Sequence, residues 1–220
     1  MKIYVAGIDP GVYGGLSLID DQGKMVKIYK TPSVAVAKNK KLRRQLDMQA
    51  AWARLSSLKK IAEVADARFV VCLEKVEAFF LDGVVAAFSL GKNLGAWEEL
   101  STALTVPFHT VLPQVWKKDI IGKTVQAPKI TNRDAAASKR KQRAKASAAR
   151  KALAIEKANQ IFPYALLDME KKYLDGVAES LLIAEWGRRN ELGLLEAGRS
   201  NHRNVSIDSP AEPTIQEDNT

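Results

Sequence analysis

The stretch that decides the fold is residues 2–29, KIYVAGIDPGVYGGLSLIDDQGKMVKIY. Its three apolar runs are separated by Pro10-Gly11 and by Asp21-Gln22-Gly23. Short apolar runs broken by Pro, Gly and Asp are typical of strands joined by tight turns. We therefore expect an antiparallel meander with strands at residues 2–9, 14–20 and 24–29.

Outward from this meander, the chain alternates between strand and helix patterns. Residues 68–74, RFVVCLE, form a valine-rich run that is too short for a helix and suits a central strand buried on both faces. Another strand is expected at residues 107–112. Helices are expected at residues 51–65, 84–104, 113–122, 147–161 and 171–190, and segments without apolar period are expected as a loop at 31–44, a mobile basic loop at 124–145 and a disordered tail at 196–220. The pattern predicts an α/β protein in which a mixed sheet is flanked by helices, in one domain of residues 1–195.

The composition excludes several classes of protein. Cys72 is the single cysteine, so neither an intramolecular disulfide nor a four-cysteine zinc site is expected, and a lone thiol suits a reducing compartment. The first residues lack an apolar stretch of signal-peptide length. Charges interrupt every apolar run well before the roughly 20 residues that span a bilayer. The sequence therefore predicts a cytoplasmic protein without a membrane partner.

The charge of the chain is unevenly distributed. Thirty-four Lys and Arg residues against 25 Asp and Glu give a formal net charge of +9. Between residues 117 and 157, 13 basic residues face 3 acidic ones, a local excess of +10, so the rest of the chain sums to −1. One concentrated basic patch attracts polyanions, and nucleic acid is the commonest such partner. A solvated face or a flexible loop would carry the same charge, and charge alone does not separate these readings.

Four carboxylates are candidates for a metal site. Asp9 and Glu74 end two expected strands, where open sheets place ligands. Asp175 and Glu179 stand four residues apart on one face of the last expected helix. Clustered acids at such positions repel one another unless they share a hard divalent cation. Each acid, taken singly, also has a simpler explanation. Asp9 could form a turn, Glu74 could be a strand-end charge, Asp175 could assist the helix start, and Glu179 could be solvated.

Six blocks in order carry a resemblance to a known family. They are GIDPG at residues 7–11, LEKVEAFF at 73–80, LGKNLGAWEEL at 90–100, LPQVWKKDIIGK at 112–123, KASAARKAL at 145–153 and DGVAESLLIA at 175–184. In this order they resemble the RuvC-type Holliday-junction resolvases of the ribonuclease H-like superfamily, over residues 2 to about 190. The bacterial form spaces its last two acids three apart, so the spacing of four between Asp175 and Glu179 resembles phage-type members more closely.

The resemblance implies a chemistry. It identifies Asp9, Glu74, Asp175 and Glu179 as the catalytic acids and as ligands for two Mg²⁺ ions per site, with Mn²⁺ as a substitute. It implies a structure-selective endonuclease that hydrolyses phosphodiesters of four-way DNA junctions and leaves 5′-phosphate and 3′-hydroxyl ends. A broader endonuclease for branched DNA is the alternative within the same fold.

The resemblance and the basic patch together identify candidate DNA contacts. These contacts are expected to bind the phosphate backbone and to position the protein without reading bases. Phe79 and Phe80 are candidates for a wedge between base pairs at the junction centre, although core packing is the commoner fate of Phe. The expected backbone contacts are Lys117, Lys118, Lys123, Lys129, Arg133, Lys139, Arg140, Lys141, Arg143 and Lys145.

Paired cuts in a nearly two-fold symmetric junction favour a homodimer. The helix expected at residues 84–104, with Gly91 and Gly95, is the candidate interface, unless it packs on the sheet instead. Two functions from other classes remain open. A sugar-kinase-like or actin-like ATPase would share the opening Asp motif but needs a later Gly-rich phosphate loop, which we do not find. A non-catalytic junction-binding protein would keep the basic patch and lose the acids.

Overall fold

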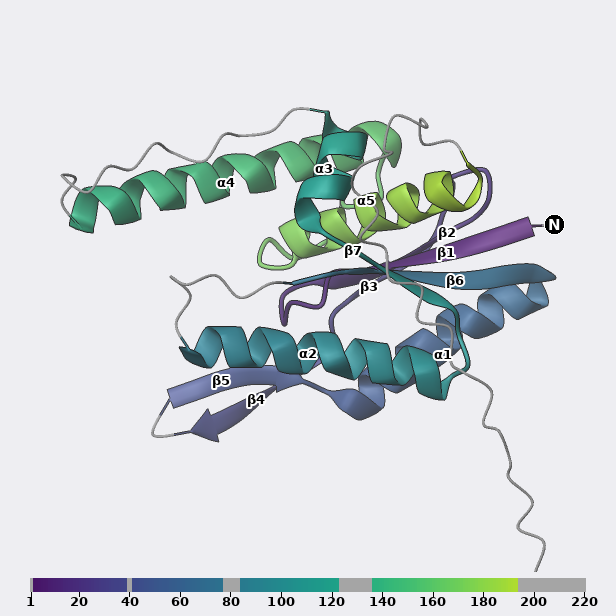
Figure 1. Cartoon of the computed structure of the whole chain (residues 1–220), viewed down its shortest axis with the longest axis horizontal. Helices are drawn as coiled ribbons and strands as arrows, with labels where there is room; N and C mark the ends of the chain where they lie inside the picture. Colours follow the sequence, from purple (N-terminus) through teal and green to yellow (C-terminus); the bar gives the residue numbers. More distant parts are fainter. Residues whose placement is uncertain (1, 39–40, 77–83, 123–135, 194–220) are drawn as a thin grey trace, which may run out of the picture.

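A computed structural model describes residues 2–38, 41–76, 84–122 and 136–193 (Figure 1). Its centre is a five-stranded mixed sheet with the order β3-β2-β1-β6-β7. Strand β1 pairs antiparallel with β2 and parallel with β6, which in turn pairs parallel with β7. The strands are β1 (Lys2–Ile8), β2 (Gly15–Ile19), β3 (Met25–Lys30), β6 (Ala67–Glu74) and β7 (Phe108–Val111). The α/β class and the mixed sheet flanked by helices, both expected from the sequence, are confirmed.

Helices cover both faces of this sheet (Figure 1). Helices α3 (Pro113–Ile121), α4 (Ala136–Ile161) and α5 (Leu174–Glu191) lie on one face, and α1 (Met48–Val64) and α2 (Val84–Ala103) lie on the other. The first layer buries Trp116 and Trp186 against the sheet. The second buries Trp97 with leucines of α1. Helix α5 thus spans the middle of one face, over β1 and β2.

Close packing of α5 on the sheet requires glycine at one position of the central strand. A Cβ atom built on Gly7 of β1 would lie 2.1 Å from the carbonyl oxygen of Ser180 and 2.3 Å from the amide nitrogen of Ala184. Both are backbone atoms of α5, which no side-chain rotation can move aside. The glycine of the GIDPG block therefore sets the distance between helix and sheet.

Two segments differ from the sequence prediction. The loop expected at residues 31–44 is wrong, because β4 (Ser33–Lys38) and β5 (Lys41–Leu46) pair there as a separate antiparallel hairpin. The alternation of Val34 and Val36 with small residues is a strand pattern that the polar and basic composition concealed.

The mobile basic loop expected at residues 124–145 is also wrong in part, because α4 already begins at Ala136. Residues 136–146 consist mainly of Ala, Lys, Arg and Gln, which favour helix without any apolar stripe. The earlier part of that expected loop and the tail at 196–220 lie outside the described residues. Within the described residues, no helix is both long and apolar enough to cross a membrane.

Candidate metal and nucleic-acid site

Asp9 and Glu74 lie side by side at one edge of the sheet. Ile8 of β1 is in register with Leu73 of β6, so the next residues of these two parallel strands, Asp9 and Glu74, are neighbours. Asp9 also shapes the turn that follows, because its Oδ1 accepts a hydrogen bond of 2.9 Å from the amide of Gly11. The turn-forming role of Asp9 and its place in an acidic cluster therefore coexist.

The start of α5 brings the second pair of acids to the same edge. Gly14, in the loop after Asp9, forms an isolated β-bridge with Gly176 of α5. A Cβ atom on Gly176 would lie 2.9 Å from Asp9 Oδ2 and 2.4 Å from the carbonyl oxygen of Tyr13. This close approach seats Asp175 and Glu179, on either side of Gly176, near the carboxylate of Asp9.

These carboxylates lie close enough to shift the pKa values of Asp9 and Glu74. Burial, followed by the negative charge of Glu179, raises the pKa of Asp9 above its ordinary value of 3.8, and Asp175 adds to the effect. Burial, followed by the charges of Asp9 and Glu179, raises the pKa of Glu74 above 4.5. The chain thus gathers negative charge at this edge that its own cations only partly neutralise.

Helix α3 contributes a cation and a hydrogen-bond donor to the cluster. Lys117 Nζ lies 2.8 Å from Glu179 Oε1, and its positive charge also lowers the pKa values of Asp9 and Glu74. Trp116 is fully buried, and its Nε1 donates a hydrogen bond of 3.0 Å to Glu74 Oε1. Lys117, expected on the sequence as a DNA contact, therefore lies among the acids, while Lys118 is exposed.

A second lysine holds the remaining acid. Lys151 of α4 lies 2.5 Å from Asp175 Oδ2, and both side chains are partly open to solvent. Neither Lys151 nor Trp116 was expected among the site residues from the sequence. Trp116 directly precedes Lys117, and Lys151 lies in the quoted block at residues 145–153, so both were within the motifs. What the motifs could not show is which acid each of them contacts.

The donor set suits a hard divalent cation. All four acids offer carboxylate oxygens, which Mg²⁺ and Mn²⁺ prefer. The ammonium groups of Lys117 and Lys151 occupy the place of cations beside Glu179 and Asp175. In the described parts of the chain, no group of three or more His, Cys, Asp or Glu side chains is arranged to hold a metal ion. Metal binding would therefore require these side chains to rearrange.

Helix α4, which carries Lys151, also carries further basic residues. It packs against α5, and its Lys141 and Lys145 are exposed. Lys139, Arg140 and Arg143 also lie on this helix, within its first eight residues. The other expected DNA contacts, Lys123, Lys129 and Arg133, and the wedge candidates Phe79 and Phe80 lie outside the described residues.

The fold and the site together define an α/β protein with four carboxylates at the ends of two parallel strands and at the start of one helix. No family model matches this chain, and no curated protein matches it in sequence. Among solved structures, the chain is similar to Thermus thermophilus RuvC in complex with a Holliday-junction substrate, with 16% identity, a TM-score of 0.45, and 88% of this chain and 98% of that one covered. It is also similar to a second Thermus thermophilus RuvC structure, with 16% identity and a TM-score of 0.42; the match covers 88% of this chain and 99% of that one.

Proposed function

We propose that this protein is a metal-dependent endonuclease that hydrolyses branched DNA, with four-way junctions as its preferred substrate. The observation that carries the proposal is the meeting of Asp9, Glu74, Asp175 and Glu179 at one sheet edge, beside a helix rich in lysine and arginine. Hydrolysis of phosphodiesters by two metal ions needs a cluster of carboxylates that can share the cations between them.

In this proposal the four acids hold two Mg²⁺ ions, and Mn²⁺ can replace them. Bound there, the ions would lower the pKa of a water molecule and stabilise the departing 3′ oxygen, which leaves 5′-phosphate and 3′-hydroxyl ends. The four-residue spacing of Asp175 and Glu179 supports a closer likeness to phage-type members of the family that the sequence resembles.

The residues around the acids have separate roles in the proposal. The Gly11 amide fixes the carboxylate of Asp9, and the indole of Trp116 fixes that of Glu74. Lys117 neutralises Glu179 through their 2.8 Å ion pair. When it leaves Glu179, its ammonium becomes available to a non-bridging oxygen of the scissile phosphate.

The basic residues predicted from the sequence are proposed to bind the phosphate backbone of the arms, from Lys118 on α3 to Lys145 on α4. Phe79 and Phe80 remain the wedge candidates.

A homodimer through α2 is part of the same proposal. Support for it comes from Gly91 and Gly95, since Cβ atoms on these glycines would have no heavy atom within 4 Å among the described residues. Neither glycine is therefore needed for packing on the sheet.

Cleavage of labelled DNA tests the proposal. Four-way, Y-shaped and linear substrates are incubated with the protein in Mg²⁺, Mn²⁺ or EDTA. We expect nicks near the branch point of the four-way junction, with either metal and not with EDTA. Asp9→Asn and Glu74→Gln should reduce the rate at least 10³-fold while DNA binding persists, as about 4 kcal/mol of lost transition-state stabilisation implies.

Glu63→Gln is the matched control, because Glu63 is an exposed acid on α1, on the other face of the sheet. Junction binding without metal-dependent nicking would replace the nuclease by a non-catalytic junction-binding protein. Nucleotide hydrolysis in the absence of DNA would point to the ATPase alternative instead.

A further inference from the structure

The hairpin formed by β4 and β5 is a second cationic element, apart from the patch at residues 117–157. Residues 33–46 contain five Lys and Arg residues and no Asp or Glu. The two strands pair from Ser33 with Leu46 to Lys38 with Lys41. The view that the basicity of this chain forms one patch is therefore incomplete, because the fold separates this hairpin from α4 (Figure 1).

The hairpin is attached to the loop that carries Asp9. The hydroxyl of Ser33 donates to the carbonyl oxygen of Val12 at 3.2 Å, two residues before the Gly14 bridge to α5. Arg44 fixes the second strand to the first, because its Nε donates to Ser33 Oγ at 2.9 Å. The base of the hairpin is thus tied to the acidic cluster through Ser33.

A groove of about 240 Å³ lies between the hairpin and α2. Its cations are Arg43, Arg44 and Lys92. Arg44 is engaged with Ser33, whereas Arg43 and Lys92 have no carboxylate partner among the described residues. Uncompensated cations in one groove favour a ligand with repeated negative charge over a neutral or a basic one.

Other lining residues favour nucleic acid as that ligand. Gln45, Ser89 and Asn93 offer hydrogen bonds of the kind that phosphate and sugar oxygens accept or donate. Phe88 is 74% exposed at the same groove and presents a flat apolar surface to a sugar or a base. An exposed ring among cations suits a nucleic-acid strand better than a simple anion.

The position of the groove relates it to the acidic cluster. Figure 1 shows α4 and the hairpin extending beyond the same end of the sheet, the end at which β1 and β6 finish, α4 on the α5 side and the hairpin on the α2 side. The acids of β1, β6 and α5 lie at that end between the two basic elements. A duplex arm held at the acids therefore has cations on both sides.

We propose that the groove between β5 and α2 is a second phosphate-backbone contact, which holds a DNA arm on the side of the acidic cluster opposite α4. This proposal deepens the proposed function and rests on it for the identity of the DNA, but it concerns binding and not cleavage. Arg43 and Lys92 are its phosphate contacts, and Arg44 is the residue that holds the hairpin in place.

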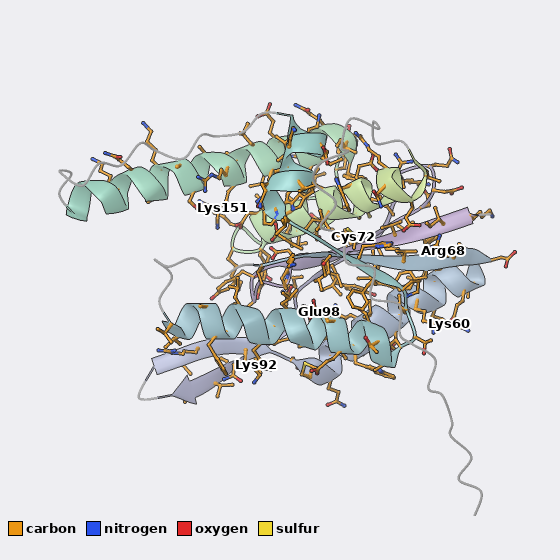
Figure 2. All side chains as sticks on the ribbon, viewed as in Figure 1. Lys60, Arg68, Cys72, Lys92, Glu98 and Lys151 are labelled. Carbon is orange, nitrogen blue, oxygen red and sulfur yellow. The ribbon has the colours of Figure 1, made fainter. Side chains whose placement is uncertain are left out.

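Binding of a fluorescently labelled four-way junction, measured by anisotropy in EDTA over a range of salt concentrations, tests the proposal. The test protein is the full chain with Arg43→Ala and Lys92→Ala combined. The matched control is Lys60→Ala, since Lys60 is likewise an exposed lysine and lies on α1, at the opposite end of the same helical layer (Figure 2). We expect about tenfold weaker binding of the double variant, and a salt dependence of log K that is flatter by roughly 2, about 0.9 for each lost phosphate contact.

Binding and salt dependence of the double variant equal to those of Lys60→Ala would overturn the proposal. The charge-preserving pair Arg43→Lys and Lys92→Arg should bind like the wild type. If the charge-preserving pair bound DNA as weakly as the alanine variant, or if the alanine variant had a lowered melting temperature, the loss of DNA binding would be assigned to damaged structure. Either result would also refute a phosphate contact.

A wild type that binds the junction in this metal-free assay, but does not nick it in the cleavage assay with Mg²⁺ or Mn²⁺, would refute the nuclease alone. Failure of the wild type to bind any DNA would refute both proposals.

Discussion

Replacing Gly7 by alanine tests how the fold positions the acidic cluster. The added Cβ atom would meet three backbone atoms of α5, namely Ser180 O at 2.1 Å, Ala184 N at 2.3 Å and Ala184 Cα at 2.9 Å. A normal contact is at least 3.4 Å. Because a strand at the centre of the sheet cannot yield, α5 must withdraw by roughly 1 Å along its packed face.

The loss of stability follows from the packing between α5 and β1 that this withdrawal disturbs. Inserting one methyl group into a packed core costs about 1–3 kcal/mol. Here the obstacle is helix backbone and not the end of a flexible side chain, so we expect a loss of about 3 kcal/mol or more in the free energy of unfolding. For a domain of this size the melting temperature should fall by roughly 6–12 °C. Urea unfolding followed by circular dichroism measures the change directly.

Gly95→Ala is the matched control for this substitution. Gly95 lies inside α2, and a Cβ atom there has no heavy atom within 4 Å among the described residues. Alanine is the better helix former by about 0.5–1 kcal/mol, so this variant should be slightly more stable than the wild type. If Gly7→Ala unfolds at the same urea concentration as the wild type, the close seating of α5 on β1 is wrong.

Three further predictions concern charge and the acid cluster. In EDTA, Asp9→Asn should stabilise the protein most at about pH 8 and least at about pH 5. Because the pKa of Asp9 is higher in the folded state than in the unfolded state, the ionised carboxylate of Asp9 destabilises the folded protein increasingly as pH rises. A uniform gain at both pH values, measured by urea unfolding, would contradict this. Glu185→Gln should lower the free energy of unfolding by about 2–3 kcal/mol in the same assay, because Glu185 is buried and accepts hydrogen bonds from two arginines of α5. A decrease of less than about 0.5 kcal/mol would refute the role of these hydrogen bonds in stability. Trp116→Phe should raise the Mg²⁺ concentration for half-maximal cleavage about tenfold, because it removes the donor that orients Glu74, and unchanged Mg²⁺ dependence would show that this bond has no role.

Most of the sheet and most of its helices were predictable from local pattern. The meander at residues 2–29 and the strand at 68–74 are confirmed because turn formers and continuous apolar runs leave few alternatives. The hairpin at residues 33–46 was missed because basic side chains on an exposed ribbon give no apolar alternation on the charged strand. The early start of α4 was missed because helix propensity without an apolar stripe resembles a solvated loop.

The strand-end positions of Asp9 and Glu74 and the shared helix face of Asp175 and Glu179 followed from residue spacing, whereas the expectation that all four acids meet came from the resemblance of the six blocks to a known family. The partners of these acids could not, because Lys117 and Lys151 reach Glu179 and Asp175 through side-chain paths that no spacing specifies. This distinction bears on the chemistry. An acidic cluster already bridged by two lysines is less costly to fold without metal than four unpaired carboxylates would be. Under the proposed function the same lysines would compete with the cation, so the affinity for Mg²⁺ would depend on α3 and α4 as much as on the acids. Helix α4 also carries basic residues proposed to bind DNA, so under that proposal DNA binding would act on the acids through α4.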